Sequence, residues 1–164
     1  MKLILFSGTH PRHLFVNQEV VKYFEEVLVI VMKRESLLPS PPKNLSLHEK
    51  NLFLQHFNNR NDVESSIYGD LDAEQVFKKH EVIYINPDQL NTESMANKVH
   101  NFNADFAFIF GVDLILDPVI GKLPKDKINL HLGLSPWYKG GATLYWPFYL
   151  LQPQFCGTTF HQIT

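Results

Sequence analysis

Two polar side chains, Asn129 and His131, interrupt the otherwise apolar run 128–132. Alternate residues of a β-strand share a face, so Asn129, His131 and Gly133 are expected to point to one side of a strand and the leucines between them to the other. An amide N–H beside a protonated imidazole can stabilise a developing oxyanion, and the imidazole can also manage the proton of an attacking amine. On its own, such a pair is more often structural and bonded to loop backbone, so the surrounding sequence has to decide between the two interpretations.

The loop after this pair has the composition of a turn that binds a ligand. Ser135 and Pro136 predict a turn, and Gly140 and Gly141 give a loop whose backbone can approach a ligand closely.

The segment SGTHPRHL near the start contains a single glycine, and Pro11 has no backbone N–H to offer a phosphate. The glycine pattern of dinucleotide-binding proteins is therefore missing, which disfavours an oxidoreductase of that kind. His10, Arg12 and His13 are either surface residues at a helix start or contacts for a substrate phosphate or carboxylate, for which arginine has the better geometry.

The elements that would position these residues alternate between strand and helix. Short apolar runs predict six strands, at 2–6, 27–31, 81–85, 105–110, 127–133 and 158–163. Apolar periodicity predicts four helices, at 11–24, 46–58, 91–100 and 142–151. The second helix begins with a capping box at Ser46 and Glu49. Short right-handed crossovers then give an α/β fold with an open, mostly parallel sheet in three layers.

Two stretches do not follow this alternation. The polar stretch 58–69 has no clear period and is assigned no element, and the prolines within 38–43 predict a loop.

Length, charge and cysteine content narrow the class of protein. A chain of 164 residues with 45% hydrophobic residues is expected to form one compact domain over residues 1–164. The formal net charge of −2 gives no overall attraction to nucleic acid or an anionic membrane, with a local basic patch left open, and no apolar run reaches the roughly 20 residues that span a bilayer. Cys156 is the only cysteine and the start has no signal-peptide pattern, so a cytoplasmic location is expected.

The sequence from Phe106 onwards resembles the folate-dependent formyltransferase family. The family motif is Asn-x-His, a Ser/Leu-Pro turn, an aromatic residue with a basic or small residue and Gly, a helix, and a Gly-x-Thr-x-His strand. The matching residues here are Asn129-Leu-His131, Leu134-Ser135-Pro136, Tyr138-Lys139-Gly140 and Gly157-Thr-Thr159-Phe-His161. The family includes glycinamide ribonucleotide formyltransferase, methionyl-tRNA formyltransferase and the sugar N-formyltransferases, and the resemblance implies a Rossmann-like fold.

By this resemblance, Asn129 and His131 are two members of the family's Asn-His-Asp catalytic set. They would stabilise the tetrahedral intermediate formed when an uncharged amine attacks the formyl group of 10-formyltetrahydrofolate, the donor, with no metal required. The residues implied for the loop that holds the pterin ring are Phe110, Gly111, Val112, Leu114 and Leu116. The residues expected to contact the acceptor are His10, Arg12, Ser135, Tyr138, Lys139 and Gly140.

The chain departs from the family at its end. The family's catalytic aspartate follows the Gly-x-Thr-x-His strand by a few residues, and this sequence stops at Thr164. We therefore expect a fragment of a longer polypeptide, because the end of a buried strand is an unusual terminus. A complete chain of this length would lack the group that orients the imidazole.

The acceptor is expected to be a small-molecule amine. The balance of 15 basic and 17 acidic residues favours a nucleotide-linked amino sugar over a tRNA, which needs a basic surface. The first loop fits the purine-synthesis enzyme less well. Two alternatives stay open: a formyltetrahydrofolate hydrolase, in which water replaces the amine, and a non-catalytic module that binds folate or a nucleotide sugar. The sequence also leaves a homo-oligomer open.

Other aromatic and polar residues are assigned more ordinary roles. The rings of the last predicted helix are expected in the core, where aromatic side chains bury well: Tyr145, Trp146, Phe148 and Tyr149. Three residues are expected on a surface loop, with a substrate-binding role left open: His56, Arg60 and Tyr68. His161 is either a packed strand residue or a neighbour of the site.

Overall fold

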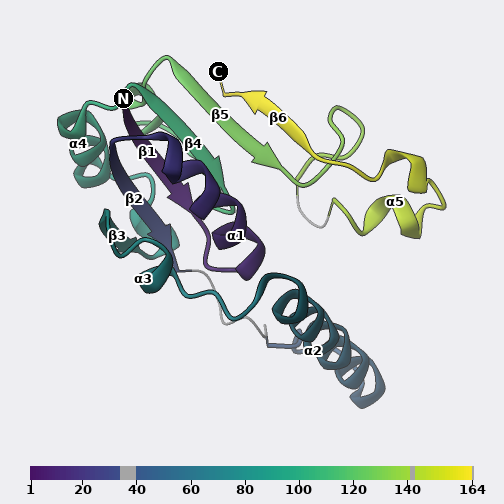
Figure 1. Ribbon diagram of the computed structural model, residues 1–164. Coiled ribbons are helices and arrows are strands. Elements are labelled where there is room, and N and C mark those ends of the chain that lie inside the picture. The colour runs from purple at the N-terminus through teal and green to yellow at the C-terminus, as the bar shows by residue number, and fades with distance from the viewer. Residues whose placement is uncertain (34–39, 141–142, 164) are drawn as a thin grey trace.

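The computed structural model describes residues 1–33, 40–140 and 143–163. Its centre is a six-stranded sheet in the order β3-β2-β1-β4-β5-β6 (Figure 1). The strands are β1 (Lys2–Ser7), β2 (Glu26–Met32), β3 (Glu81–Ile85), β4 (Phe106–Phe110), β5 (Asp126–His131) and β6 (Thr159–Gln162). The first five are parallel, and β6 pairs with β5 in the antiparallel sense. The predicted open, mostly parallel α/β sheet is confirmed, with each strand end within two residues of its predicted position.

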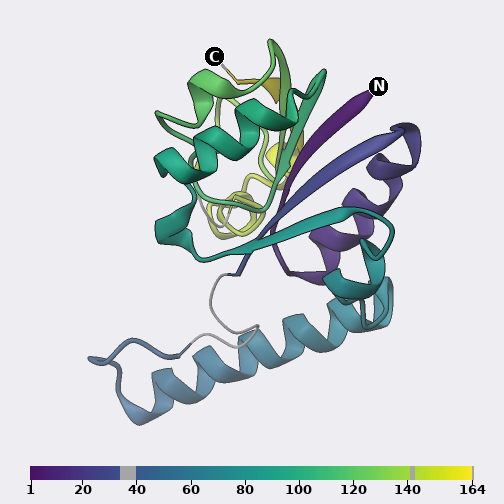
Figure 2. The same cartoon turned by 90° about the vertical axis from the view of Figure 1, so that its left-hand side faces the viewer.

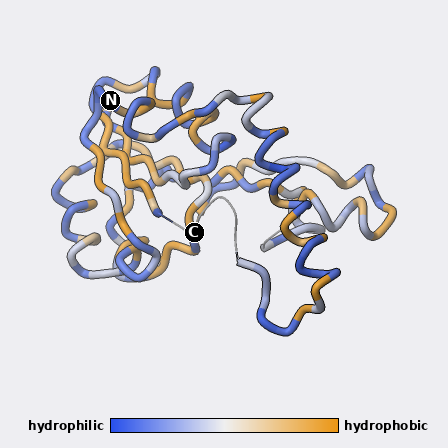
Figure 3. The backbone as a smooth tube through the Cα atoms, turned by 90° about the horizontal axis from the view of Figure 1, so that it is seen from below, coloured by the Kyte–Doolittle hydropathy of each residue, from blue (hydrophilic) through white to orange (hydrophobic). Residues whose placement is uncertain are grey.

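Helices cover both faces of the sheet and make it the middle of three layers. α1 (Pro11–Val20) and α3 (Ala73–Val76) pack on one face, and α4 (Glu93–Phe102) packs on the other. The residues they bury include Leu14 and Ala73 on the first face and Met95, Ala96 and Val99 on the second. β1 and β2 are continuous apolar runs because both of their faces are covered. Figure 3 shows hydrophobic residues gathered along the strands.

α2 (Leu47–Tyr68) lies outside these layers. It begins with the predicted capping box, in which the Ser46 hydroxyl accepts from the Glu49 N–H and the Glu49 carboxylate accepts from the Ser46 N–H. None of its residues is buried, and Figure 2 shows the helix running below the strands in that view. Leaving 58–69 without an element was therefore wrong. This half of the helix has no apolar stripe, because it covers no part of the core.

The segment between β5 and β6 also differs from expectation. The predicted helix 142–151 is a single turn, α5 (Trp146–Tyr149), with Pro147 near its start; Gly141 and Ala142 lie outside the described residues. The expectation that the rings of this segment lie in the core was wrong, because Tyr145 is 51% exposed and Trp146, Phe148 and Tyr149 are 42%, 59% and 64% exposed. α5 lies beside the 3₁₀ turn that follows it and not against the sheet (Figure 1).

Short 3₁₀ helices join the main elements. The described residues contain four of them: Val21–Tyr23, Pro87–Gln89, Ile120–Lys122 and Pro153–Phe155. In the predicted loop 38–43, residues 40–43 form neither helix nor strand, and 38 and 39 lie outside the described residues. In the part of the chain that the structure describes, no helix combines the length and apolar character that crossing a membrane requires.

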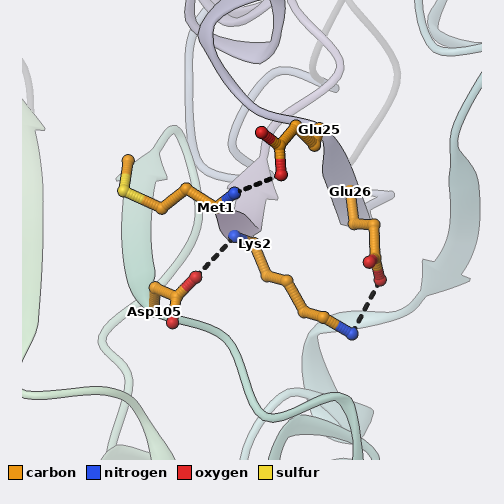
Figure 4. Close-up of polar contacts among 5 residues, drawn as sticks. All are labelled: Met1, Lys2, Glu25, Glu26 and Asp105. Carbon is orange, nitrogen blue, oxygen red and sulfur yellow. Dashed lines mark hydrogen bonds and ion pairs between the residues drawn. The ribbon is translucent and has the colours of Figure 1, made fainter.

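Polar contacts align the amino ends of the neighbouring strands β2, β1 and β4 (Figure 4). The Lys2 N–H donates to Asp105 at 2.7 Å, and the Lys2 ammonium pairs with Glu26 at 2.7 Å. The ammonium of Met1 pairs with Glu25 at 2.6 Å, a hydrogen bond that raises the pKa of the ammonium and lowers the pKa of the carboxylate. Such exposed pairs add little stability. The parallel register, with Lys2 opposite Glu26 and Leu3 opposite Phe106, sets the strands level, so their carboxyl ends meet at the opposite edge.

Candidate active site

The site lies where the order of the strands reverses. In the sheet β1 has β2 on one side and β4 on the other. In open α/β sheets, ligands bind in the crevice that this reversal leaves outside the carboxyl ends of the strands. Gly8, directly after β1, donates its N–H to the Phe110 carbonyl at 3.0 Å, and Gly111 follows β4 with a φ of 87°.

The imidazole of His13, on α1, forms the floor of this crevice. A Cβ atom added to Gly8 would lie 2.4 Å from His13 Nδ1, and one added to Gly111 would lie 2.3 Å from the same atom. The ring is buried and meets Phe110 edge-on, with 4.6 Å between ring centroids. Both glycines therefore make room for a side chain of the protein itself, which agrees with the missing dinucleotide-binding pattern.

A cavity of about 870 Å³ opens above this floor. One wall is formed by the ends of β4 and β5 and the residues that follow them. A second wall is formed by α2, and a third by Gly140 and residues 143–146. The volume is within the range of pockets that bind small molecules.

Asn129 lines the cavity from β5 and is paired across the sheet with His161 on β6. Its Nδ2 donates to His161 Nε2 at 3.0 Å. This bond orients the amide and uses one of its two N–H groups. The second N–H can donate to a ligand. His161 therefore belongs beside the site, because its ring holds Asn129.

His131 lines the same cavity and is held by the loop that follows its strand. Its Nε2 lies 3.0 Å from the carbonyl oxygen of Tyr138. A carbonyl only accepts hydrogen bonds, so Nε2 carries a proton and Nδ1 is the nitrogen that can gain or lose one. A Cβ atom on Gly133 would lie 2.6 Å from both His131 Nε2 and the Tyr138 carbonyl oxygen. Glycine at this position permits the contact.

Two threonines hold the turn between β5 and α5. The Thr159 hydroxyl donates to the Gly133 carbonyl at 2.7 Å and accepts from the Ser135 N–H at 3.0 Å. The Thr143 hydroxyl donates to the Leu132 carbonyl. These bonds satisfy backbone groups that the end of the strand leaves unpaired, and they keep the chain after His131 in one path.

Solved structures with this fold carry formyltransferase names. Glycinamide ribonucleotide transformylase 1 from Symbiobacterium toebii aligns with a TM-score of 0.57 and 11% identity. Phosphoribosylglycinamide formyltransferases from Anaplasma phagocytophilum and Bacillus halodurans align with TM-scores of 0.58 and 0.58 and identities of 15% and 13%. The alignments cover 100%, 99% and 100% of this chain and 66%, 64% and 72% of those proteins. The chain has the formyltransferase fold.

One stretch of the chain also has a relative in sequence. Over 61 residues, 37% of the chain, it is 33% identical to methionyl-tRNA formyltransferase from Thermodesulfovibrio yellowstonii. The match spans 20% of the length of that relative. No family model matches the chain. The resemblance to folate-dependent formyltransferases is confirmed by the fold and by this stretch of sequence.

Within the formyltransferase fold, about half of the predicted site residues line the cavity. They are Arg12, Phe110, Gly111, Val112, Asn129, His131 and Gly140. Leu114 and Leu116 are exposed and do not line it; their loop is held by Asn91, whose amide donates to the Leu114 carbonyl and accepts from the Leu116 N–H.

The other predicted acceptor contacts do not line the cavity. His10 packs against His13, with 5.4 Å between ring centroids. Ser135 is bound to Thr159, and the buried Tyr138 donates its hydroxyl to Gln152 at 2.7 Å. Lys139 is exposed and does not line the cavity.

Sequence reasoning missed the wall formed by α2. The lining residues of this helix are Leu52, Phe53, His56, Phe57, Arg60 and Glu64. His56, Arg60 and Glu64 are four residues apart, a spacing that places side chains on one face of a helix. This four-residue spacing is present in the sequence, but it indicates a shared helix face only once residues 58–68 are known to be helical. The surface-loop assignment of His56, Arg60 and Tyr68 was wrong, since all three lie in α2.

Proposed function

We propose that the protein is an N-formyltransferase that moves a formyl group from 10-formyltetrahydrofolate to an amine. The observation that carries the proposal is that Asn129 and His131, two residues apart on β5, line one cavity in a chain with the formyltransferase fold. Each is oriented by a further residue, His161 for the amide and Tyr138 for the imidazole.

The cavity suits the formyl donor in size and lining. A pteridine ring and its substituents need a pocket with apolar walls and a few polar groups at one place. Phe53, Phe57 and Leu132 supply apolar surface, and the backbone after β4 at Gly111 and Val112 lies along one side. These residues would hold the donor, and Asn129 and His131 are the polar groups nearest the end of β5.

The chemistry assigned to the two side chains follows from their hydrogen bonds. The second N–H of the Asn129 amide donates to the oxygen of the reacting formyl carbon as that oxygen becomes negative. His131 Nδ1 carries a proton toward the same oxygen, or takes the proton that the amine loses when the new C–N bond forms. The bond between the formyl carbon and the donor nitrogen then breaks, the proton lost by the amine passes to that nitrogen, and tetrahydrofolate is released.

For the acceptor we propose an amino sugar linked to a nucleotide. The relatives are named for other acceptors, glycinamide ribonucleotide and methionyl-tRNA. A net charge of −2 gives no broad basic surface for a tRNA. The cavity, in contrast, contains Arg12, which is suited to a phosphate of a small molecule.

The proposal is tested by incubating the protein with 10-formyltetrahydrofolate and a panel of amines that includes nucleotide-linked amino sugars. Release of tetrahydrofolate together with a formylated amine supports the transferase. Formate release that needs no amine indicates a hydrolase instead. A folded protein that releases tetrahydrofolate with none of these acceptors is not the proposed enzyme.

A further inference from the structure

The α2 wall of the cavity carries an unbalanced positive charge. Arg12, from α1, donates to Glu64 Oε1, and Arg60 Nε lies 3.9 Å from the same oxygen. One carboxylate thus stands between two guanidinium groups. Among the described residues that line the cavity there is no other carboxylate and no lysine, so the lining has a formal charge of +1 before any histidine is protonated.

These three side chains are largely shielded from solvent. The exposed fractions of Arg12, Arg60 and Glu64 are 25%, 27% and 12%. Burial lowers the pKa of Arg60; Glu64 opposes that change and Arg12 adds to it. Charges in such surroundings interact more strongly than they would in water, so an anion that enters the cavity is attracted to this wall.

Arg60 is held in place by its own helix. Its guanidinium lies over the ring of Phe57, with 4.6 Å between the central carbon and the ring centroid. It also donates to Asn61 at 3.4 Å. A guanidinium fixed in this way loses little conformational freedom when it binds, and its planar set of N–H groups matches the oxygens of a phosphate or a carboxylate.

We propose that Arg12 and Arg60 bind an oxyanion group, a phosphate or a carboxylate, carried by the formyl acceptor. The choice of the acceptor as the source of this group rests on the proposed function. Asn129 and His131 lie on the sheet wall of the same cavity. An acceptor bound by its anionic group at α2 would extend its amine toward them.

The test measures oxyanion binding without the reaction. Pyrophosphate is titrated at constant ionic strength and followed by tryptophan fluorescence, since Trp146 lines the cavity. Arg60→Ala is expected to weaken binding about tenfold or more, because hydrogen bonds to charged groups are the strong ones. Lys50→Ala removes a positive charge from α2 outside the cavity lining and is expected to leave binding unchanged. Equal affinities in these two variants, or no binding to the unmodified protein, would overturn the proposal.

A second variant distinguishes loss of the oxyanion site from misfolding as the cause of weaker pyrophosphate binding in Arg60→Ala. Glu64→Gln removes the carboxylate charge and keeps an oxygen that can accept from the arginines, so pyrophosphate binding is expected to tighten severalfold. General damage to the fold weakens binding in every variant. Opposite changes in Arg60→Ala and Glu64→Gln therefore support the oxyanion site, and weakening in both contradicts it.

The oxyanion group could belong to the acceptor or to the donor, which also carries carboxylates. A titration with tetrahydrofolate distinguishes these two sources. If the acceptor supplies the group, Arg60→Ala leaves tetrahydrofolate affinity within about twofold and raises the KM of an anionic acceptor about tenfold. An equal loss for tetrahydrofolate overturns the assignment to the acceptor. If formyl transfer is absent but the pyrophosphate pattern holds, the proposed function fails and the oxyanion site stands. If transfer occurs with an unchanged acceptor KM in Arg60→Ala, the site fails and the function stands.

Discussion

The sheet wall and the α2 wall face one cavity but are held in place by different means. Leu3, Leu5 and Phe6 of β1 have no exposed surface, and β4 is likewise packed between helices and neighbouring strands. α2 buries none of its residues. Its contacts with α1 include the ion pair of Arg12 with Glu64 and one contact between aromatic rings. That contact is between Phe15 and Tyr68, with centroids 5.1 Å apart.

The difference in burial between the sheet and α2 suggests that the two walls serve different purposes. The proposed catalytic roles of Asn129 and His131 require side chains held within about 0.5 Å, and the pairing of β5 with β4 and β6 fixes the strand that carries both. An element with few buried apolar contacts opens at a lower free energy than the core does. We therefore expect that changes in α2 alter which molecules bind, while changes at the ends of the strands alter turnover or global stability.

The largest effect is expected at the end of β5. His131→Ala removes the imidazole to which the proposed function assigns proton transfer at the reacting oxygen, and it should lower kcat on the order of 10²-fold or more. The matched control is His48→Ala, which removes an exposed imidazole from α2 outside the cavity lining and should leave kcat unchanged. The measurement is tetrahydrofolate release at saturating donor and acceptor. Similar kcat values for His131→Ala and the unmodified protein would show that the sheet wall does not carry the chemistry.

The next comparison uses two glycines with positive φ, one in each region. Gly111 has a φ of 87° and a Cβ there would strike His13, whereas Gly69, at the end of α2, has a φ of 76° and open space around it. Gly111→Ala should lower the free energy of unfolding by about 2–3 kcal/mol, because backbone strain and a clash in the core add together. Gly69, with a ψ of 175°, lies in a region of φ and ψ that is essentially restricted to glycine; Gly69→Ala should therefore strain the end of α2 but change the free energy of global unfolding little, because α2 buries no residue. Chemical denaturation measures both, and equal losses would contradict the contrast between the two walls.

The sheet could be predicted from sequence because most of its strands are short apolar runs. A strand that is buried on both faces has apolar residues at successive positions. The shared face of Asn129 and His131 followed from the two-residue period of a strand. The second half of α2 could not be predicted in this way, since a helix that covers no core needs no apolar stripe. The α2 wall also depends on a contact between Arg12 and Glu64, 52 residues apart, which no local pattern encodes. The rings of Phe148 and Tyr149 were assigned to the core from their chemistry alone, but their single helical turn does not lie against the sheet.

A smaller effect, confined to α2, is expected from its N-cap. Ser46→Ala removes the hydroxyl that accepts from the Glu49 N–H and should cost about 1 kcal/mol of helix stability. Because α2 buries no residue, global unfolding should change little, while hydrogen exchange of the amides in its first turns should become faster. An equal loss of protection in β1 would show that helix and sheet unfold as one unit.

The smallest expected effect is a pH dependence at the same helix end. The hydroxyl and the backbone N–H of Ser46 both donate to the Glu49 carboxylate, and they lower its pKa below the ordinary value of 4.5. A carboxylate whose pKa is lower in the folded state stabilises the fold above the unfolded pKa, and this contribution disappears as the pH falls through the folded pKa. The first turn of α2 should therefore fray on acidification below about 4.5, seen as a change in the amide chemical shift of Lys50, while β1 stays unchanged. In Ser46→Ala the hydroxyl donor is gone, so the Glu49 carboxylate should titrate closer to its ordinary pKa. Identical titration midpoints with and without the hydroxyl would mean that the capping box does not hold this end of α2 in solution.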